Sequence, residues 1–290
     1  MNLYLQSTVS GILVGGLYAI MSLGLSLSWG VLKIINLVHF AFILLAGYVT
    51  YELSTTLGLD PFVGLVVVVP IFFIAGAALQ WFFDKVQISE FNSLLVTFAL
   101  LIIFESLARS IWSADFRQIP SEQNPYSSEA LWVGDIALQV PRLAAFGMAL
   151  VVTALMVYLL DRTYFGKAVR ALAEDREMAV AFGINSSRVS VVLAGLAAAF
   201  AALAGVFVVM SQALVPGLAI EWFAIVFPVV ILGGLGSTKG SLVAGIIIGV
   251  VSAIATVAAG PSMAPLITFV ILILTLLFRP EGLFARGTAA

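Results

Sequence analysis

The stretch "FVGLVVVVPIFFIAGAALQWFF", Phe62 to Phe83, contains no charged residue and is long enough to cross a bilayer as one helix. Over the whole chain 62% of residues are hydrophobic and 10% are charged, whereas a soluble domain carries about 25% charged residues. The apolar runs are continuous rather than alternating, which indicates helices and not barrel strands, because a helix satisfies its own backbone hydrogen bonds in lipid. The predicted fold class is all-α, a polytopic integral membrane protein with a single transmembrane domain over residues 1–290.

Uninterrupted apolar windows predict about nine membrane spans. The seventh and eighth spans flank "GGLGSTKGS" and could form one broken pair. The first segment has no Lys or Arg before it, so we expect a retained helix rather than a cleaved signal peptide. The nine windows are Leu5 to Leu27, Ile35 to Leu53, Phe62 to Phe83, Ser93 to Trp112, Leu143 to Leu160, Val189 to Val208, Ile220 to Leu235, Leu242 to Ala258 and Ala264 to Phe278.

The basic residues predict the orientation, because Lys and Arg next to spans are retained on the cytoplasmic side. An external N-terminus and a cytoplasmic C-terminus leave only Arg117 and Arg142 outside, with Arg109 within a span. The loop of about residues 113–142, which is acidic and punctuated by prolines, is then external, and the loop of about residues 161–188 is cytoplasmic. The basic residues placed inside are Lys33, Lys85, Arg162, Lys167, Arg170, Arg176, Arg188, Lys239, Arg279 and Arg286.

Charge is concentrated in "RALAEDREMAVAFGI", Arg170 to Ile184, inside the predicted cytoplasmic loop. Its apolar residues recur at a spacing of three and four, which predicts one short amphipathic helix. Gly183 suits the left-handed conformation that ends a helix, and Asn185 offers a cap for the next one. The helix could rest on lipid headgroups or dock onto a cytoplasmic partner. The predicted apolar face consists of Val169, Leu172, Ala173, Ala179, Val180 and Gly183.

Four blocks in order carry a family resemblance: "GGLYAIMSLGLSLSWGVLKIINLVHFAFILLAGY", "SADFRQIP", "FGKAVRALAEDREMAVAFGINSSRV" and "FAIVFPVVILGGLGSTKGSLVAGIIIGVV". Together they resemble the branched-chain amino acid permease family of ABC importers, whose third block is the cytoplasmic coupling segment. Phe40 departs from the small residue that usually follows the His of the first block. The resemblance implies that Leu172, Ala173, Glu174, Asp175, Ala179, Gly183 and Ile184 couple the chain to an ATPase.

The resemblance also implies the partners: a second permease subunit, usually a paralogue, two cytoplasmic ATPase subunits and an external substrate-binding protein. It implies a multi-pass protein of a prokaryotic inner membrane, with no catalytic site, no nucleic-acid partner and no cofactor of its own, since ATP and Mg are bound by the ATPase subunits. The residues agree with this division. A P-loop needs Ser or Thr after its Lys, but Lys239 of "GGLGSTKGS" precedes Gly240. The absence of Cys and the single His exclude thiolate metal sites and histidine clusters.

A few polar residues inside the predicted spans are candidates for the translocation pathway, because ionisable groups are costly in lipid. Glu105 and Arg109 lie four residues apart, which predicts an ion pair and leaves a substrate contact as the alternative. His39 with Asn36 is either packed and hydrogen-bonded or close to a gate. The candidate pathway residues are therefore Asn36, His39 and Glu105. Glu221 begins a span, where snorkelling or capping is the simplest role.

Glycines four apart in "GILVG" and "GIIIG" predict close helix packing rather than a binding motif. The predicted function is the permease subunit of an importer for branched-chain or related aliphatic amino acids, working by alternating access. The alternative is a secondary transporter or channel for a small neutral solute. Such a protein is expected to carry several intramembrane carboxylates or a charged filter, and only Glu105 sits well inside a predicted span.

Overall fold

The computed structural model describes residues 3–127, 129–279 and 282–284. Seven helices are long and apolar enough to cross a membrane. They are α1 (Leu3–Leu32), α2 (Val38–Leu57), α3 (Pro61–Val86), α4 (Glu90–Trp112), α5 (Val140–Arg162), α8 (Ser186–Ser211) and α10 (Thr238–Ala259). Two shorter apolar helices, α9 (Leu218–Gly233) and α11 (Met263–Phe278), lie at the other two predicted windows. The chain is a multi-pass membrane protein.

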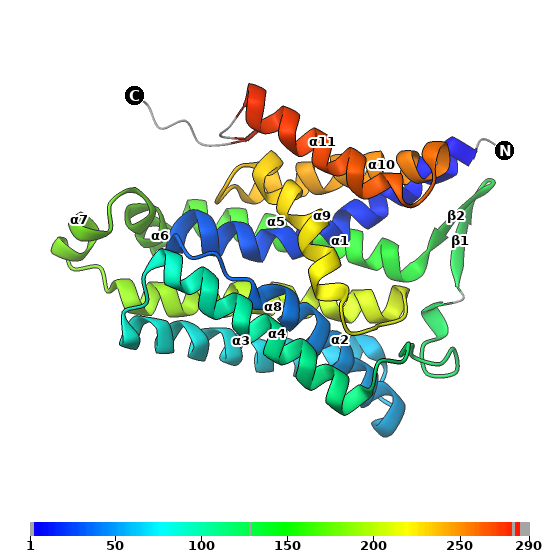
Figure 1. The fold of residues 1–290 in the computed structure, drawn as a ribbon, viewed down its shortest axis with the longest axis horizontal. Coiled ribbons are helices and arrows are strands. Elements are labelled where there is room, and N and C mark those ends of the chain that lie inside the picture. Colours follow the sequence, from blue (N-terminus) through cyan, green and yellow to red (C-terminus); the bar gives the residue numbers. More distant parts are fainter. Residues whose placement is uncertain (1–2, 128, 280–281, 285–290) are drawn as a thin grey trace.

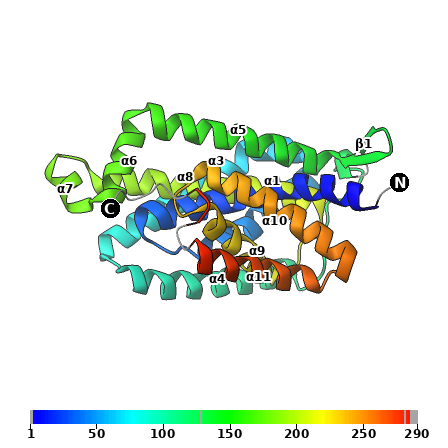
Figure 2. The ribbon, with the colours of Figure 1, turned by 90° about the horizontal axis from the view of Figure 1, so that it is seen from above.

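The helices form an elongated bundle with two distinct ends (Figure 1). One end carries α6 (Tyr164–Glu174) and α7 (Arg176–Ala181), and we call it the α6–α7 end. The opposite end carries α1's first turn and the strands β1 (Ala130–Val133) and β2 (Ile136–Gln139), and we call it the hairpin end. Figure 2 shows α5 along one long side of the bundle and α4 with α11 along the opposite side.

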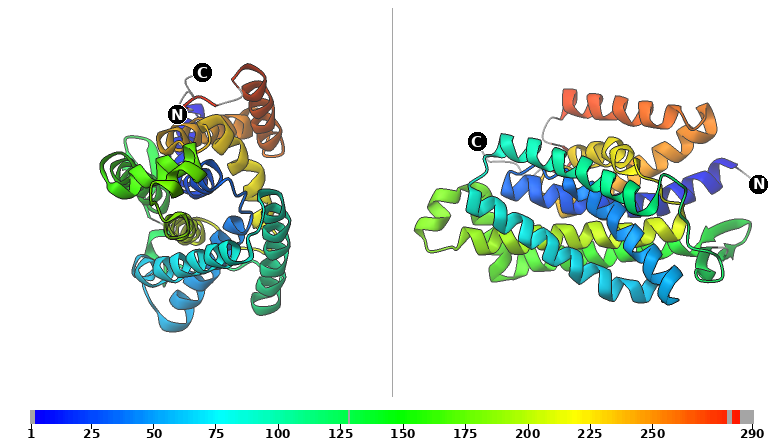
Figure 3. Two further views of the ribbon diagram at one scale, coloured as in Figure 1. Left: turned by 90° about the vertical axis from the view of Figure 1, so that its left-hand side faces the viewer. Right: turned by 60° about the horizontal axis from the view of Figure 1, so that its bottom comes forward.

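The core lies around α1 and α8, the two spanning helices with the largest buried share. Viewed from the α6–α7 end, α8 lies between α3 and the pair formed by α1 and α5 (Figure 3). Small residues make this close packing possible. A Cβ on Gly205 of α8 would meet the Ile43 carbonyl oxygen of α2 at 2.2 Å, and one on Gly76 of α3 would meet the Ala198 Cβ at 2.4 Å. These glycines therefore set the distances between helices in the core.

The two glycine pairs of α1 and α10 pack against each other, which confirms the packing interpretation of "GILVG" and "GIIIG". A Cβ on Gly11 would lie 2.8 Å from the Gly249 carbonyl oxygen, and a Cβ on Gly15 would lie 2.7 Å from that of Gly245. No side chain fits between the two backbones at these positions. Helix association in lipid depends on such van der Waals contact. Lipid tails are as apolar as the side chains, so association gains no free energy from the hydrophobic effect.

Helix α2 begins at Val38, three residues after the predicted start of the second span, because residues 33–37 form a non-helical connector. Its backbone is held by α4: the Thr97 hydroxyl donates to the Ile35 carbonyl oxygen at 3.0 Å and accepts from the Leu37 N–H at 3.2 Å. Irregular backbone is tolerated in a membrane protein only where such partners replace the helix's own bonds. The connector therefore fixes where α2 starts.

The described chain is mainly helical, as predicted for an all-α protein, and the loop between α4 and α5 adds one short β-hairpin. β1 and β2 pair antiparallel, with Val133 opposite Ile136. Gly134, with φ +63°, starts the two-residue turn between them. The strands are only four residues each, too short for the sequence to distinguish them from a loop.

Candidate functional site in the charged loop and the helix bundle

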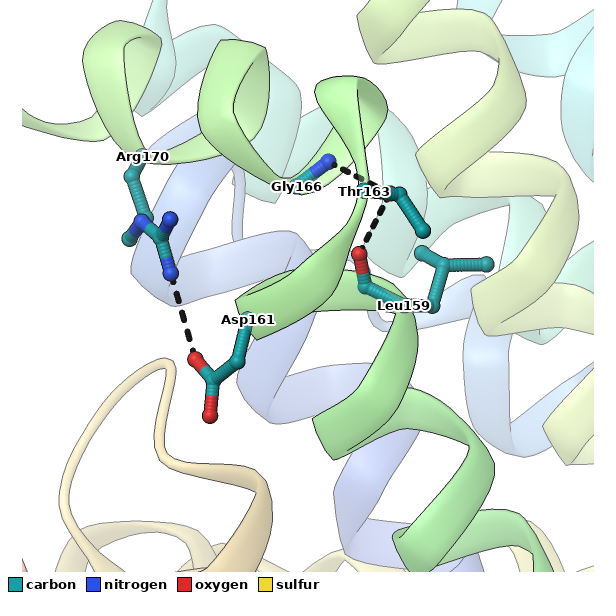
Figure 4. Close-up of polar contacts among 5 residues, drawn as sticks. All are labelled: Leu159, Asp161, Thr163, Gly166 and Arg170. Carbon is teal, nitrogen blue, oxygen red and sulfur yellow. Dashed lines mark hydrogen bonds and ion pairs between the residues drawn. The ribbon is translucent and has the colours of Figure 1, made fainter.

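The turn from α5 into α6 is tightly built. The Thr163 hydroxyl caps α6 by accepting from the Gly166 N–H at 3.2 Å, and it donates to the Leu159 carbonyl oxygen (Figure 4). A Cβ on Gly166 would meet the Leu160 carbonyl oxygen at 2.1 Å, so only glycine fits here. Arg170 pairs with Asp161 at 3.1 Å, but both side chains are over a third exposed and such a pair adds little stability. The turn directs α6 back onto the bundle.

The expectation of one helix over Arg170 to Ile184 is wrong, because the helix breaks at Asp175. This residue is extended, with φ −147° and ψ 108°. Its carboxylate accepts from the backbone N–H groups of Glu177 and Met178 at 2.9 and 3.0 Å, which caps α7. Aspartate is a favoured N-cap because it satisfies amides that have no partner within the helix. The segment is therefore two helices, α6 and α7.

The apolar side of the segment is divided between the core and the surface, contrary to a single outward contact face. Val169, Leu172 and Ala179 are buried within the chain, the last at 4% exposure. The apolar side chains that remain exposed are Met178 at 54%, Val180 at 49% and Phe182 at 82%. Of the other predicted coupling residues, Glu174, Asp175 and Gly183 are exposed, and Ala173 and Ile184 are half-buried. The sequence prediction does not include Met178 and Phe182, although their spacing of four places them on one face.

Both predicted signals at the end of the segment are confirmed. Gly183 has φ +88°, in the left-handed region that favours glycine. The Asn185 side chain accepts from the Arg188 N–H at 3.0 Å and so caps α8. Gly183 and Asn185 together turn the chain from α7 into α8.

A cavity of about 530 Å³ lies beside α7, between the end of α3 and the start of α8. Its lining includes Asp84, Lys85, Glu90 and Arg176. Asp84 links the two helices, since it accepts from the Ser187 hydroxyl at 2.8 Å and from the Gln80 amide at 2.9 Å. The α6–α7 end thus presents a charged hollow that Arg176 of α7 helps to line.

His39 and Asn36 lie together where the connector meets α2. His39 is 2% exposed, and its Nε2 lies 2.8 Å from the Met21 carbonyl oxygen of α1. The Asn36 carbonyl oxygen accepts from the His39 N–H at 3.3 Å, while the buried Asn36 Oδ1 has no hydrogen-bond partner. His39 therefore holds the start of α2 against α1.

Phe40, the departure from the family pattern, is fully buried in an aromatic cluster. Its ring meets those of His39 and Phe223 edge-to-face, at centroid distances of 5.8 and 5.7 Å. Phe223 in turn contacts Phe227, which stacks on Trp29. The large side chain at this position thus joins α1, α2 and α9.

The predicted ion pair between Glu105 and Arg109 is wrong. Among the residues that the structure describes, the only salt bridge joins Arg170 and Asp161. Glu105 is 7% exposed and Arg109 is exposed. The backbone N–H groups of Gly217 and Ala219, at the start of α9, interact with the Glu105 carboxyl group, whereas its Oε1 has no hydrogen-bond partner. The charge of Arg109 acts on this carboxylate without a close ion pair, and the N-terminus of α9 stabilises it as well.

The loop of residues 113–142 is anchored to the bundle. The backbones of Arg117 and Leu214 exchange two hydrogen bonds, at 2.8 and 2.7 Å, and the Asn124 amide donates to the Met210 carbonyl oxygen. The Tyr126 hydroxyl donates to Asp60 at 2.8 Å, and this bond to a carboxylate raises the pKa of Tyr126. The loop therefore has a defined position over the hairpin end.

The "GGLGSTKGS" segment packs against α1, although Leu235 and Lys239 remain exposed. The Gly236 N–H donates to the Ser26 hydroxyl at 3.0 Å, and the Ser237 hydroxyl accepts from the Gly240 N–H to cap α10. α9 and α10 are thus separate helices with a short tight junction. No group of three His, Cys, Asp or Glu side chains that could hold a metal ion occurs in residues 3–127, 129–279 and 282–284.

Comparison with known proteins extends over nearly the whole chain. The chain is similar to the high-affinity branched-chain amino acid transport system permease protein BraD of Pseudomonas aeruginosa. The two are 26% identical, and the similarity covers 98% of this chain and 96% of that protein. LivH of Escherichia coli K12, which bears the same description, is 24% identical over 98% and 96% of the two chains. The probable branched-chain amino acid transport permease protein LivH of Methanocaldococcus jannaschii is 25% identical over 94% and 90%. No solved structure matches the chain.

A family model described as "Branched-chain amino acid transport system / permease component" matches residues 7–276. This range covers most of α1 and α11 and all the helices between them, including the α6–α7 segment and the glycine-paired core. The chain therefore belongs to the family of permease components of branched-chain amino acid transport systems.

Proposed function

We propose that this chain is the permease subunit of an ABC importer for branched-chain or related aliphatic amino acids. The match of the family model over residues 7–276 carries this proposal. The proposed partners are a second permease subunit, two cytoplasmic ATPase subunits that bind ATP and Mg, and an external substrate-binding protein. The chain itself is not an enzyme in this proposal, and its membrane is the inner membrane of a prokaryote.

The proposed topology has nine crossings, an external N-terminus and a cytoplasmic C-terminus. The distribution of basic residues supports it, because the α6–α7 end gathers most of them and cytoplasmic ends retain Lys and Arg. Arg117 and Arg142 lie at the hairpin end, and Arg286 lies outside the described residues. The described residues at the α6–α7 end are Lys33, Lys85, Arg162, Lys167, Arg170, Arg176, Arg188, Lys239 and Arg279.

The proposed coupling segment is α6 with α7 and the turn at Gly183. Its support is an exposed apolar pair, Met178 and Phe182, on a segment whose buried residues tie it to the bundle. Such a segment transmits force, since α6 packs on α1, α5 and α8. ATP-driven movement of a partner against α7 would then reach the spanning helices through α6, as alternating access requires.

The test is reconstitution of the chain with candidate ATPase, partner permease and binding-protein subunits from the same organism. We expect leucine uptake into proteoliposomes that requires ATP and the ATPase subunits. The control is the same preparation with a hydrolysis-deficient ATPase. Leucine uptake by the chain without ATPase subunits, driven by an ion gradient, would instead establish the secondary-transporter alternative.

A further inference from the structure

A second cavity, of about 360 Å³, lies between α1, α5 and α9 at the hairpin end. Its volume falls within the range of about 300 to 1,000 Å³ that is usual for small-molecule sites. Arg142 from the first turn of α5 and Glu221 from the first turn of α9 both line it. The fold thus brings into one cavity a cation and an anion that lie far apart in the sequence.

Neither charge is neutralised by the chain itself. Arg142 donates one hydrogen bond, from Nη1 to the Ser10 hydroxyl at 2.9 Å, and a guanidinium has five N–H donors in all. Across the part of the chain that the structure describes, neither Arg142 nor Glu221 has an ion-pair partner. The cavity therefore offers one free cationic and one free anionic group, with a net charge of zero.

The remaining lining combines apolar and polar side chains. Leu17, Ile225 and the buried Trp222 supply aliphatic and aromatic surface. Tyr18 and Gln212 add a hydroxyl and an amide that can donate or accept hydrogen bonds. Small-molecule sites have this composition, an apolar wall with a few polar groups that fix orientation.

We propose that this cavity is a recognition site for a zwitterionic aliphatic amino acid. The solute carboxylate pairs with Arg142, its ammonium group pairs with Glu221, and its side chain lies against Leu17, Trp222 and Ile225. Arg142 is half-buried, so a solute without a carboxylate would leave a partly desolvated guanidinium unpaired, whereas the exposed Glu221 adds a counter-charge for the ammonium group. This site lies within the proposed importer and rests on that function, and it deepens it by assigning the residues that select a zwitterion.

The first experiment measures binding to the purified full chain in lipid nanodiscs with three probes of the same alkyl skeleton. These are L-leucine, 3-methylbutylamine, which lacks the carboxylate, and 4-methylpentanoate, which lacks the ammonium group. We expect Arg142→Gln to weaken leucine binding about tenfold or more while leaving the amine unaffected. Glu221→Gln should weaken leucine binding by a smaller factor, because Glu221 is exposed, while leaving the carboxylate probe unaffected. Arg142→Lys should retain part of the affinity because it keeps the cation.

The matched controls are Arg109→Gln and Glu52→Gln, which change exposed residues outside the cavity. Both should bind leucine as the unchanged chain does. Equal leucine affinity in the chain, Arg142→Gln and Glu221→Gln would overturn the inference. So would losses that are the same for all three probes, because they would report damage to the fold rather than lost charge pairing.

A second measurement does not depend on the charged variants folding. The chain has no cysteine, so Val14→Cys places a unique thiol on the cavity wall. Leucine should slow its modification by a small methanethiosulfonate, whereas Ser121→Cys, in the loop, should react at the same rate with and without leucine. Unchanged modification of Val14→Cys at saturating leucine also overturns the inference. Failure of ATP-dependent uptake with this protection intact would instead remove the proposed function and leave the site.

Discussion

Glu105 and Arg109 lie one helical turn apart on α4, yet their surroundings differ because α4 has only one face against the bundle. Glu105 is 7% exposed and faces the start of α9, and Arg109 points outward. At this scale the fate of a side chain depends on which neighbouring helix meets it. Sequence spacing alone cannot supply that information.

We expect Glu105→Gln and Arg109→Gln to act almost independently on stability. The coupling energy in a double-mutant cycle should stay below about 0.5 kcal/mol, the usual size for an exposed pair. Glu105→Gln should cost more than Arg109→Gln, because it removes a negative charge from the N-terminus of α9. Free energies of unfolding in mixed micelles would measure this. A coupling energy above about 1 kcal/mol would instead show that Glu105 and Arg109 form an ion pair.

Gly183 is the residue that turns α7 into α8, and its constraint is conformational. Its φ is +88°, and a Cβ built there would meet nothing within 4 Å. Gly183→Val should therefore lose about 1 to 2 kcal/mol of stability through left-handed strain alone. Gly183→Asn is the matched control, because asparagine visits this conformation more readily. If the two variants unfold at the same temperature, the left-handed turn is not what requires glycine.

At the scale of elements, the α1–α10 contact depends on the absence of side chains. Gly15→Ala should destabilise the protein by about 1 to 3 kcal/mol, because its Cβ would lie 2.6 Å from the Ile246 Cα. Gly147→Ala on the open face of α5 meets nothing within 4 Å and should gain up to about 1 kcal/mol from helix propensity. Thermal unfolding of the two variants compares them directly. Equal changes in unfolding temperature for the two variants would mean that α1 and α10 do not pack closely in solution.

The α7 surface yields a different expectation for the coupling segment. Phe182→Ala together with Met178→Ala should reduce co-purification of the ATPase at least about tenfold, as loss of an exposed apolar anchor does. Phe116→Ala, an equally exposed phenylalanine at the hairpin end, should leave ATPase association unchanged. Ala179→Trp is not a clean probe, because Ala179 is buried and overpacking would destabilise the chain. Normal ATPase association of the double variant would place the coupling contact elsewhere.

At the scale of the molecule, the two ends should lie on opposite sides of the membrane. Single cysteines at Ser121 and Ala181 test this, since both positions are exposed and the chain has no cysteine. An impermeant thiol reagent should label Ser121→Cys in intact cells and Ala181→Cys only after the membrane is opened. The reverse labelling pattern would invert the proposed topology.

The parts of this protein that could be predicted from sequence are those governed by local chemistry. The apolar windows gave the spanning helices, because a segment in lipid must satisfy its own backbone. Gly183 and Asn185 gave the end of one helix and the start of the next, because caps use residues within a few positions. The glycine pairs indicated close packing but not which helices would meet. The family resemblance, carried by whole blocks, was confirmed over residues 7–276.

Only the tertiary structure decided how distant residues meet. It separated Glu105 from Arg109 and divided the apolar side of the charged loop between core and surface. It also brought Arg142 and Glu221 to one cavity. In the sequence, Arg142 bears only on the orientation in the membrane, and Glu221 only marks the start of a predicted span. The physical reason is that burial and pairing depend on helix rotation and on the identity of the neighbouring helix, which the packing of the complete bundle determines.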